Sequence, residues 1–353
     1  MDNEKEELTA SVKVSETAQG LIDAAFNRLK DLGGGEEIIR LFPNGIESID
    51  LEISVGIREK NDFHMALKID GTEAVKARTF TLRGETEAVV EPEDEEDTNL
   101  SFNSNGHHII FLIALRDLEV TSPTALQRVN QILQDGGGRT PFEAANYADA
   151  IRNQQPETKP FHYVDIPLRE NGPRNPPLPN APHVLSKIDE FTDLLSNGGG
   201  NHEETVNRLS WLIHLFGDVH QPLHCVERFN QFNVNGDRGG NGFRLRGRPN
   251  NLHSLWDGSV NMSRNIDDED LAIEIFNEHT RDSLATSLQI QDTERWARDG
   301  FNLAKSFAYT LVENPQNPPR PPAQYKQRME QIGRRQAALG GYRLSNRLKQ
   351  IFE

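Results

Sequence analysis

The feature that most constrains the fold is an apolar helix pattern over residues 203–219 that also carries ionisable side chains. Its apolar positions recur at helical spacing and are Val206, Leu209, Ile213 and Phe216. His214 and Asp218 lie four residues apart, so both project from one face of the helix, about one turn from each other. A helix that only packs would rarely carry such groups, so the segment predicts a metal site.

Two ligands at this spacing can bind one ion at about 2.0 to 2.2 Å, the range for zinc with nitrogen and oxygen donors. Pro222 ends or kinks the helix and moves His224 to a different position, where it can serve a second ion. The alternative interpretation is a set of core histidines that are hydrogen-bonded to the backbone. Three further segments bear on this choice.

The first of these segments, residues 237–260, ends with His253 and Asp257, again four residues apart on an expected helical turn. Residues 239–241 (GGN) precede them as a turn that lets the backbone approach a site closely. The second segment contributes Asp149, Arg152, His162 and Asp165. Taken alone, the first two of these would be an ion pair on a surface helix. The third segment places His107 and His108 side by side at the start of a helix.

An acidic run over residues 91–97 separates two kinds of pattern. Like charges repel each other, so the run predicts a solvated linker and a domain boundary. Residues 1–95 indicate a small α+β domain, with a helix over 15–35 and strands over 46–57, 63–70 and 77–84. Residues 96–101 are the end of the linker, and residues 102–353 indicate an all-α domain, so the predicted fold class is mainly α.

Helical spacing of apolar residues marks the second domain. Helices are expected over 106–118, 123–134, 184–197, 203–219, 267–279 and 294–314. Proline-rich segments at 167–182 and 314–323 predict ordered loops or connections.

The overall charge restricts the partners. Lys and Arg total 38 against 54 Asp and Glu, which gives a formal charge of −16. This balance disfavours broad electrostatic binding to nucleic acid or to an anionic membrane, but not a compact site whose positive charge comes from metal ions.

No stretch approaches the roughly 20 apolar residues that span a bilayer. No secretory signal is visible at the start, so we expect a soluble monomer, cytoplasmic or exported by a non-classical route.

Five motifs in this chain point to one family. They are YADAIR (147–152), FHYVDIP (161–167), HLFGDVHQPLH (214–224), GGN (239–241) and NLHSLWD (251–257). Together they closely resemble the zinc-dependent type I nucleases of fungi and plants, whose superfamily also includes the bacterial zinc phospholipases C. The resemblance covers about residue 102 to the C-terminal region. It implies a mostly α-helical fold with a cluster of three zinc ions.

Carried over motif by motif, the resemblance assigns ligands to each zinc ion. The first would take Asp149, His162, His214 and Asp218. The second would take His224, His253 and Asp257. The third would take His107 and share Asp218. His220 matches the family pattern but is not a ligand there, and Cys225, the single cysteine, is expected to be a buried and inert thiol.

The chain departs from the family at Phe102, where the family has an N-terminal tryptophan whose backbone binds the third zinc ion. An amide nitrogen inside a chain is a poor ligand, because its lone pair is delocalised into the peptide bond. Three alternatives stay open: the chain is cut before Phe102, His108 or another group substitutes, or the third site is altered or empty. The expected content is therefore two to three zinc ions.

The resemblance implies a phosphodiesterase that hydrolyses single-stranded DNA or RNA to products with 5′-phosphates, with 3′-nucleotidase activity as a further reaction. Asp165 would orient the attacking water, and Arg152 would stabilise charge on the transition state. One alternative is a phospholipase C that uses the same metals. Another is a catalytically impaired binding or effector protein that retains zinc as a structural element.

Overall fold

The computed structural model describes residues 49–55, 62–69, 72–81, 104–135, 137–261 and 266–353. Contacts between Cα atoms divide the chain into two units, Met1–Glu95 and Glu96–Glu353. The helix predicted over 15–35, the acidic run over 91–97 and Phe102 lie outside the described residues.

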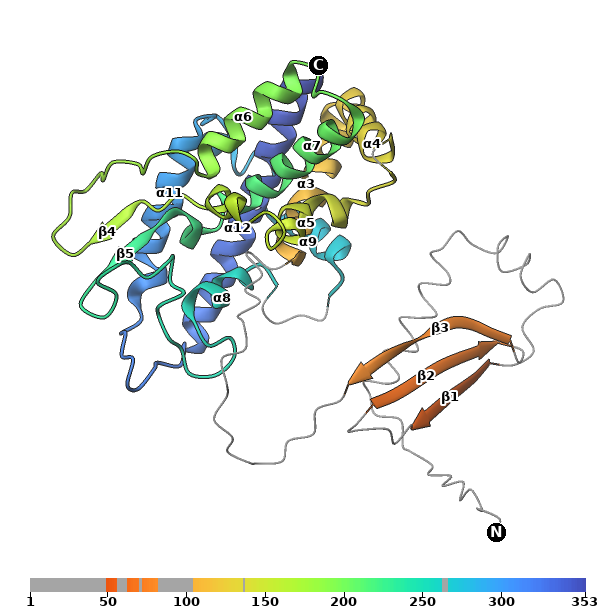
Figure 1. The fold of residues 1–353 in the computed structure, drawn as a ribbon, viewed down its shortest axis with the longest axis horizontal. Coiled ribbons are helices and arrows are strands. Elements are labelled where there is room, and N and C mark those ends of the chain that lie inside the picture. The colour runs from red at the N-terminus through yellow and green to blue at the C-terminus, as the bar shows by residue number, and fades with distance from the viewer. Residues whose placement is uncertain (1–48, 56–61, 70–71, 82–103, 136, 262–265) are drawn as a thin grey trace, which may run out of the picture. The chain divides into compact units, whose positions relative to one another are not determined.

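In the first unit, three antiparallel strands form one sheet in the order β1–β2–β3 (Figure 1). The strands are β1 (Ile49–Val55), β2 (Asp62–Ile69) and β3 (Thr72–Thr81). Ile49 pairs with Ile69 at one end of the first hairpin, and Val55 pairs with Phe63 at the other. The three predicted strands are confirmed, but β3 begins at Thr72 rather than at residue 77.

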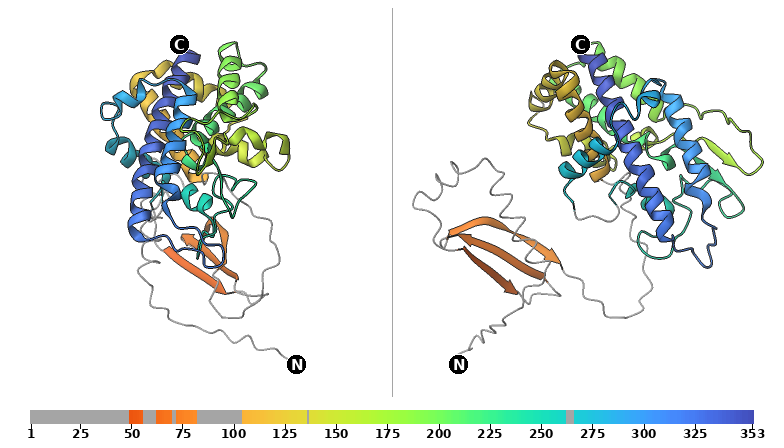
Figure 2. Two further views of the ribbon diagram at one scale, coloured as in Figure 1. Left: turned by 90° about the vertical axis from the view of Figure 1, so that its left-hand side faces the viewer. Right: turned by 180° about the vertical axis from the view of Figure 1, so that it is seen from behind.

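The second unit is mainly α-helical (Figures 1 and 2). Its α-helices are α3 (Ser104–Thr121), α4 (Pro123–Asp135), α5 (Pro141–Ile151), α6 (Val184–Ser196), α7 (His202–Asp218), α8 (Leu252–Asp257), α9 (Asp268–Glu278), α10 (Ala285–Leu288), α11 (Thr293–Ser306) and α12 (Ala323–Phe352). Its 3₁₀-helices are η1 (Pro156–His162), η2 (Pro222–Cys225) and η3 (Ala308–Thr310). A two-stranded parallel sheet pairs β4 (Pro167–Arg169) with β5 (Glu227–Phe229).

The local sequence explains how α7 begins and why it is buried. Asn201 caps the helix by accepting a hydrogen bond from the Glu204 amide, while the Glu204 carboxylate accepts one from the Asn201 amide. From Leu209 to Asp218 every residue of α7 is buried. α5 and α6 pack against it, so the polar groups on this helix lie inside the domain.

The 30-residue helix α12 is not among the predicted helices. It contacts α3, α4, α6, α7 and α9, and it runs through the length of the helical unit as the dark blue helix in Figure 1. Its buried face contains Gly333, Arg334, Gln336, Gly340, Gly341 and Arg343 beside Ala and Leu. These residue types hide the apolar stripe, because glycine lets the helices approach closely and arginine and glutamine are usually exposed.

The helix predicted over 294–314 is wrong at its C-terminal end. α11 ends at Ser306, Phe307 leaves the helical conformation with φ −136° and ψ −53°, and η3 follows. Among the described residues, no helix is both long and apolar enough to cross a membrane.

Candidate metal centre

The eight predicted ligands come from six separate elements, which meet inside the helical unit. α3 carries His107, α5 carries Asp149, η1 carries His162, and α7 carries His214 and Asp218. η2 contributes His224, and α8 contributes His253 and Asp257. These side chains form three groups, each with ligand atoms within 4.8 Å of one another. The groups are His107, Asp149 and His214; His162, His214 and Asp218; and His224, His253 and Asp257.

The four side chains expected to hold the first ion converge closely. His162 Nδ1 lies 3.1 Å from His214 Nε2 and 3.0 Å from Asp218 Oδ2, and these last two atoms are 3.2 Å apart. Asp149 Oδ1 lies 3.9 Å from His162 Nδ1 and 3.8 Å from His214 Nε2. Ligands about 2.0 to 2.1 Å from a tetrahedral zinc ion would lie about 3.3 Å from one another. The spacing fits one such ion.

The second group is wider. His224 Nε2 lies 3.9 Å from Asp257 Oδ1, and His253 Nε2 lies 3.7 Å from Asp257 Oδ2. The rings of His224 and His253 stack with their centroids 5.0 Å apart. His224 Nε2 and Asp257 Oδ2 are buried without a hydrogen-bond partner among the described residues. Buried polar atoms of this kind are costly unless a ligand binds them, so the donor set fits a cation here as well.

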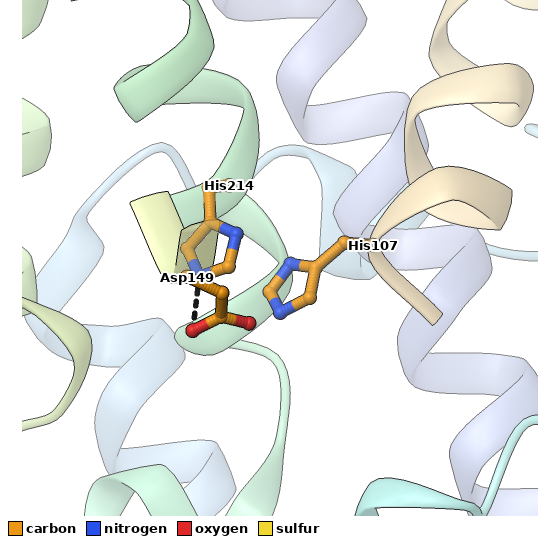
Figure 3. Close-up of side chains that lie close together, drawn as sticks. All are labelled: His107, Asp149 and His214. Carbon is orange, nitrogen blue, oxygen red and sulfur yellow. Dashed lines mark ion pairs between the residues drawn. The ribbon is translucent and has the colours of Figure 1, made fainter. Parts of the chain in front are cut away.

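His107 approaches the first group from α3. Its ring stacks on that of His214, with 3.7 Å between the centroids, and Figure 3 shows both rings beside the Asp149 carboxylate. His107 Nε2 also lies 3.6 Å from Asp218 Oδ1. His108, the alternative ligand, instead lies with Nδ1 2.8 Å from Asp268 Oδ2 on α9, and it belongs to none of the three groups.

Backbone carbonyls orient three of the histidines. His214 Nδ1 lies 2.8 Å from Ala145 O, His224 Nδ1 lies 2.9 Å from His162 O, and His253 Nδ1 lies 2.8 Å from Gly239 O. Each Nδ1–H donates to its carbonyl, so Nε2 is the nitrogen that can bind a metal when the imidazole is neutral. Gly239, at φ +59°, reaches His253 in a conformation that disfavours side chains. This is the close backbone approach expected of residues 239–241.

The electrostatics of the centre are dominated by burial and by Asp218. Burial alone would lower the pKa of His214 and that of His224, but the Asp218 carboxylate overcomes it. Asp149 adds to the effect at His214, and the pKa values rise to about 9 for His214 and about 10 for His224. In turn, these imidazoles hold the pKa of the buried Asp218 carboxyl well below its usual range. Without a bound metal ion, these shifts favour an ionised Asp218 carboxylate beside protonated His214 and His224.

The two predicted catalytic residues lie at the edge of this centre. Asp165 follows η1, and burial together with the Glu227 carboxylate raises its pKa to about 7. Arg152 caps the C-terminus of α5. Its positive charge acts on His253 and on the Tyr163 hydroxyl. Arg152 is therefore near the second ligand group.

Gln221 is a supporting residue that the sequence patterns did not single out. It is fully buried, and its Nε2 donates to Asp257 Oδ1 over 2.8 Å while its Oε1 accepts from the Leu223 amide. This leaves Asp257 Oδ2 on the side of His253. The available signal was the position of Gln221 in the motif HQPLH, three residues before the predicted ligand His224.

His220 is held away from the ligand groups, as the resemblance implies. Its Nδ1 donates to Phe216 O over 2.7 Å, and its Nε2 accepts from Arg343 Nη1 over 2.8 Å. Burial and then Arg343 lower its pKa to about 3, so the imidazole is neutral. Arg343 is itself 2% exposed and also donates to Ser287 O. Cys225 is buried as predicted, and burial raises the pKa of its thiol.

Comparison with known proteins identifies the family to which a chain with this arrangement of side chains belongs. The family model described as S1/P1 Nuclease matches residues 102–353. The chain belongs to the S1/P1 nuclease family. The match includes the described elements that carry the three ligand groups.

Relatives within the S1/P1 family are distant. Nuclease S1 from Aspergillus oryzae is 27% identical over 165 residues, which cover 44% of this chain and 53% of the relative. The chain thus spans about half the length of that relative. Endonuclease 4 from Arabidopsis thaliana is 27% identical over 240 residues, which cover 60% of this chain and 76% of the relative. Among solved structures, Alpha Toxin from Clostridium absonum aligns with a TM-score of 0.37 at 16% identity, covering 73% of this chain and 65% of that one.

The contact between His220 and Arg343 makes a stability prediction. His220→Ala removes the acceptor of a buried guanidinium, so the free energy of unfolding should fall by about 2–4 kcal/mol. Urea denaturation followed by circular dichroism measures the change. The double variant His220→Leu/Arg343→Met removes the charge together with its acceptor and should recover part of the loss. Equal losses in the single and the double variant would contradict this account.

The raised pKa of Asp165 makes a prediction about pH for the metal-free protein. The pKa of an aspartate in an unfolded chain is about 3.9, and the pKa of Asp165 in the folded chain is about 7. The stability that comes from its neutral carboxyl is therefore fully present below about pH 4 and is lost as the pH rises through about 7. The side chain of Asp165→Asn stays neutral at every pH. After chelator treatment of both proteins, the free energy of unfolding of the variant should therefore rise relative to that of wild type as the pH rises across that window. The exposed Asp193→Asn is the control, and parallel curves for Asp165→Asn and wild type would refute the assignment.

Proposed function

We propose that this protein is a zinc-dependent phosphodiesterase that hydrolyses single-stranded nucleic acid and leaves 5′-phosphates on the products. Membership of the S1/P1 nuclease family supports hydrolysis of nucleic acid. The names of the relatives, a nuclease and an endonuclease, point the same way. The observation that carries the proposal is the convergence of Asp149, His162, His214 and Asp218 at the spacing of a zinc ligand shell.

The residues that would hold the metal follow from the groups described above. One ion would bind the four convergent side chains, and a second would bind His224, His253 and Asp257. A third would bind His107 at the edge of the first group, where Asp149, His214 and Asp218 also offer oxygen and nitrogen atoms. Zinc supplies Lewis acidity and positive charge, which offset the charge of a phosphodiester.

Two residues of the chain would accept the proton of the attacking water molecule and stabilise the negative charge that develops on the phosphate. The Asp165 carboxyl, with its pKa near about 7, is partly ionised at neutral pH and can accept a proton from a water molecule that it orients. Arg152 carries a positive charge beside His253, where it can stabilise negative charge on the phosphate oxygens. Burial of four of the candidate ligand histidines and of Asp218 excludes bulk water from one side of the site; these histidines are His107, His162, His214 and His224.

Metal content and cleavage together test the proposed function. Wild type should contain two or three zinc ions by mass spectrometry and should cut a single-stranded oligonucleotide, and EDTA should abolish the cutting. Asp218→Asn removes the carboxylate whose oxygens lie 3.0 Å from His162 Nδ1, 3.2 Å from His214 Nε2 and 3.6 Å from His107 Nε2, so its rate should fall to that of EDTA-treated wild type. Asp193→Asn, on the exposed face of α6, should leave the rate and the zinc content unchanged.

Two outcomes would decide against the nuclease. Cleavage of phosphatidylcholine without cleavage of the oligonucleotide would assign a phospholipase C. Full zinc occupancy with no turnover of either substrate, and loss of stability alone in Asp218→Asn, would assign zinc a structural role in a binding protein.

A separate prediction concerns Gln221 as a positioning residue for Asp257. Gln221→Leu removes the donor that fixes the carboxylate, so zinc affinity should fall about 10- to 100-fold in competition with a chromophoric chelator. Gln336→Leu is the matched control, because Gln336 is also buried but donates to His220 O rather than to a ligand. Its zinc affinity should match wild type. Unchanged affinity in Gln221→Leu would show that Asp257 needs no support.

A further inference from the structure

Residues 238–256 are strongly basic within an acidic chain. They contain Arg238, Arg244, Arg246 and Arg248 and no aspartate or glutamate, whereas the chain as a whole carries a formal charge of −16. The ligand groups use His253 from this stretch but none of these arginines. The arginines therefore need a separate explanation.

The backbone presents three of these arginines on a short hairpin. Leu245 N donates to Asn250 O over 2.7 Å, and Leu252 N donates to Phe243 O over 3.0 Å. Phe243 and Leu245 are buried, whereas Arg244, Arg246 and Arg248 are exposed. We call residues 243–252 with these three side chains the arginine hairpin. Its buried apolar side fixes it to the domain, so its charges face solvent.

Acidic side chains near the hairpin are engaged elsewhere. Among the described residues, no ion pair involves Arg244, Arg246 or Arg248. Glu313 pairs with Arg228, and the Glu227 carboxylate accepts from the Arg238 amide. Arg246 N donates to Pro319 O, and its guanidinium donates to the neutral Asn317. The positive charge of the hairpin is thus left available to a mobile anionic partner.

The arginine hairpin is joined to the metal centre at both ends. On its N-terminal side, Gly239 O accepts from His253 Nδ1, and Gly240 O accepts from the His253 amide over 3.4 Å. On its C-terminal side, the chain runs directly into α8, which carries His253 and Asp257. The hairpin is therefore connected at both ends to the backbone that carries or holds His253.

We propose that the arginine hairpin binds the backbone phosphates of a single-stranded nucleic acid beyond the phosphodiester that is cleaved. This inference rests on the proposed function and extends it from the scissile bond to the length of the substrate. Arginine recognises phosphate oxygens by charge and by paired N–H donors. Contacts to the backbone position a strand without reading its sequence. The hairpin also explains how a strongly acidic protein holds a long polyanion, because elsewhere the net charge opposes binding.

The test compares two charge-matched variants with wild type. The hairpin variant is Arg244→Gln/Arg246→Gln/Arg248→Gln. The control variant is Arg128→Gln/Arg335→Gln/Lys349→Gln, which removes three positive charges from α4 and α12. Figure 1 shows α4, which carries Arg128, and the C-terminal end of α12, whose last turn carries Lys349, at the opposite end of the helical unit from α8, and Arg335 lies near the middle of α12. A second hairpin variant, Arg244→Gln/Arg248→Gln, keeps the contact between Arg246 and Asn317.

Fluorescence anisotropy in EDTA measures binding of a labelled oligodeoxythymidylate of about 20 nucleotides. The triple hairpin variant should bind about tenfold more weakly than the control variant near 0.1 M salt. Its slope of log K against log salt should be smaller by about 2, since each phosphate contact to a single strand contributes about 0.7. The double variant should show roughly two thirds of that change in slope.

Turnover of a short substrate separates this inference from the proposed function. In zinc-loaded protein, kcat/KM for the oligonucleotide should fall about tenfold more in the triple hairpin variant than kcat/KM for a dinucleotide. Equal binding by the hairpin and control variants would overturn the inference. So would loss of binding to phosphatidylglycerol vesicles with oligonucleotide binding intact, because the hairpin would then be a membrane contact. If wild type cleaves neither substrate, the proposed function fails, while the anisotropy still decides whether the hairpin binds nucleic acid.

Discussion

The centre of the helical unit depends on keeping one fully buried carboxylate, that of Asp218, in its charged form. A lone carboxylate in the interior loses its hydration at a cost of several kcal/mol, so it must be surrounded by compensating groups. His162, His214 and His224 supply them, and they hold the pKa of Asp218 well below its usual range. These three histidines come from η1, α7 and η2. Their contacts with the single Asp218 carboxylate therefore hold these three elements against each other.

A further set of contacts makes this arrangement specific. Backbone carbonyls of Ala145, His162 and Gly239 each accept from a ligand histidine, and Gln221 fixes Asp257. The Ala145 carbonyl lies within α5, the His162 carbonyl at the end of η1 and the Gly239 carbonyl in a turn. The ligand atoms are therefore positioned by the main chain as much as by their own helices, which favours a preorganised centre over one that metal must assemble.

Much of the fold and of the grouping of the candidate ligands follows from the sequence, for identifiable reasons. Helical spacing predicts α7, and the four-residue separations predict that His214 with Asp218, and His253 with Asp257, share a face. Helix α12 is missed because its buried face uses glycine, glutamine and arginine. The pairing of Arg343 with His220 spans 123 positions and no local pattern encodes it. Its physical basis is tertiary, since a buried guanidinium is acceptable only beside an acceptor that the fold supplies.

The long helix α12 has a consequence for how the centre comes into being. The candidate ligands lie between residues 107 and 257, whereas the guanidinium that steadies the turn between Asp218 and His224 belongs to residue 343. During synthesis the whole donor set leaves the ribosome before Arg343 does. A nascent chain would thus present the candidate ligands without the packing that gives them their final geometry, so the geometry of the candidate centre is a property of the finished domain.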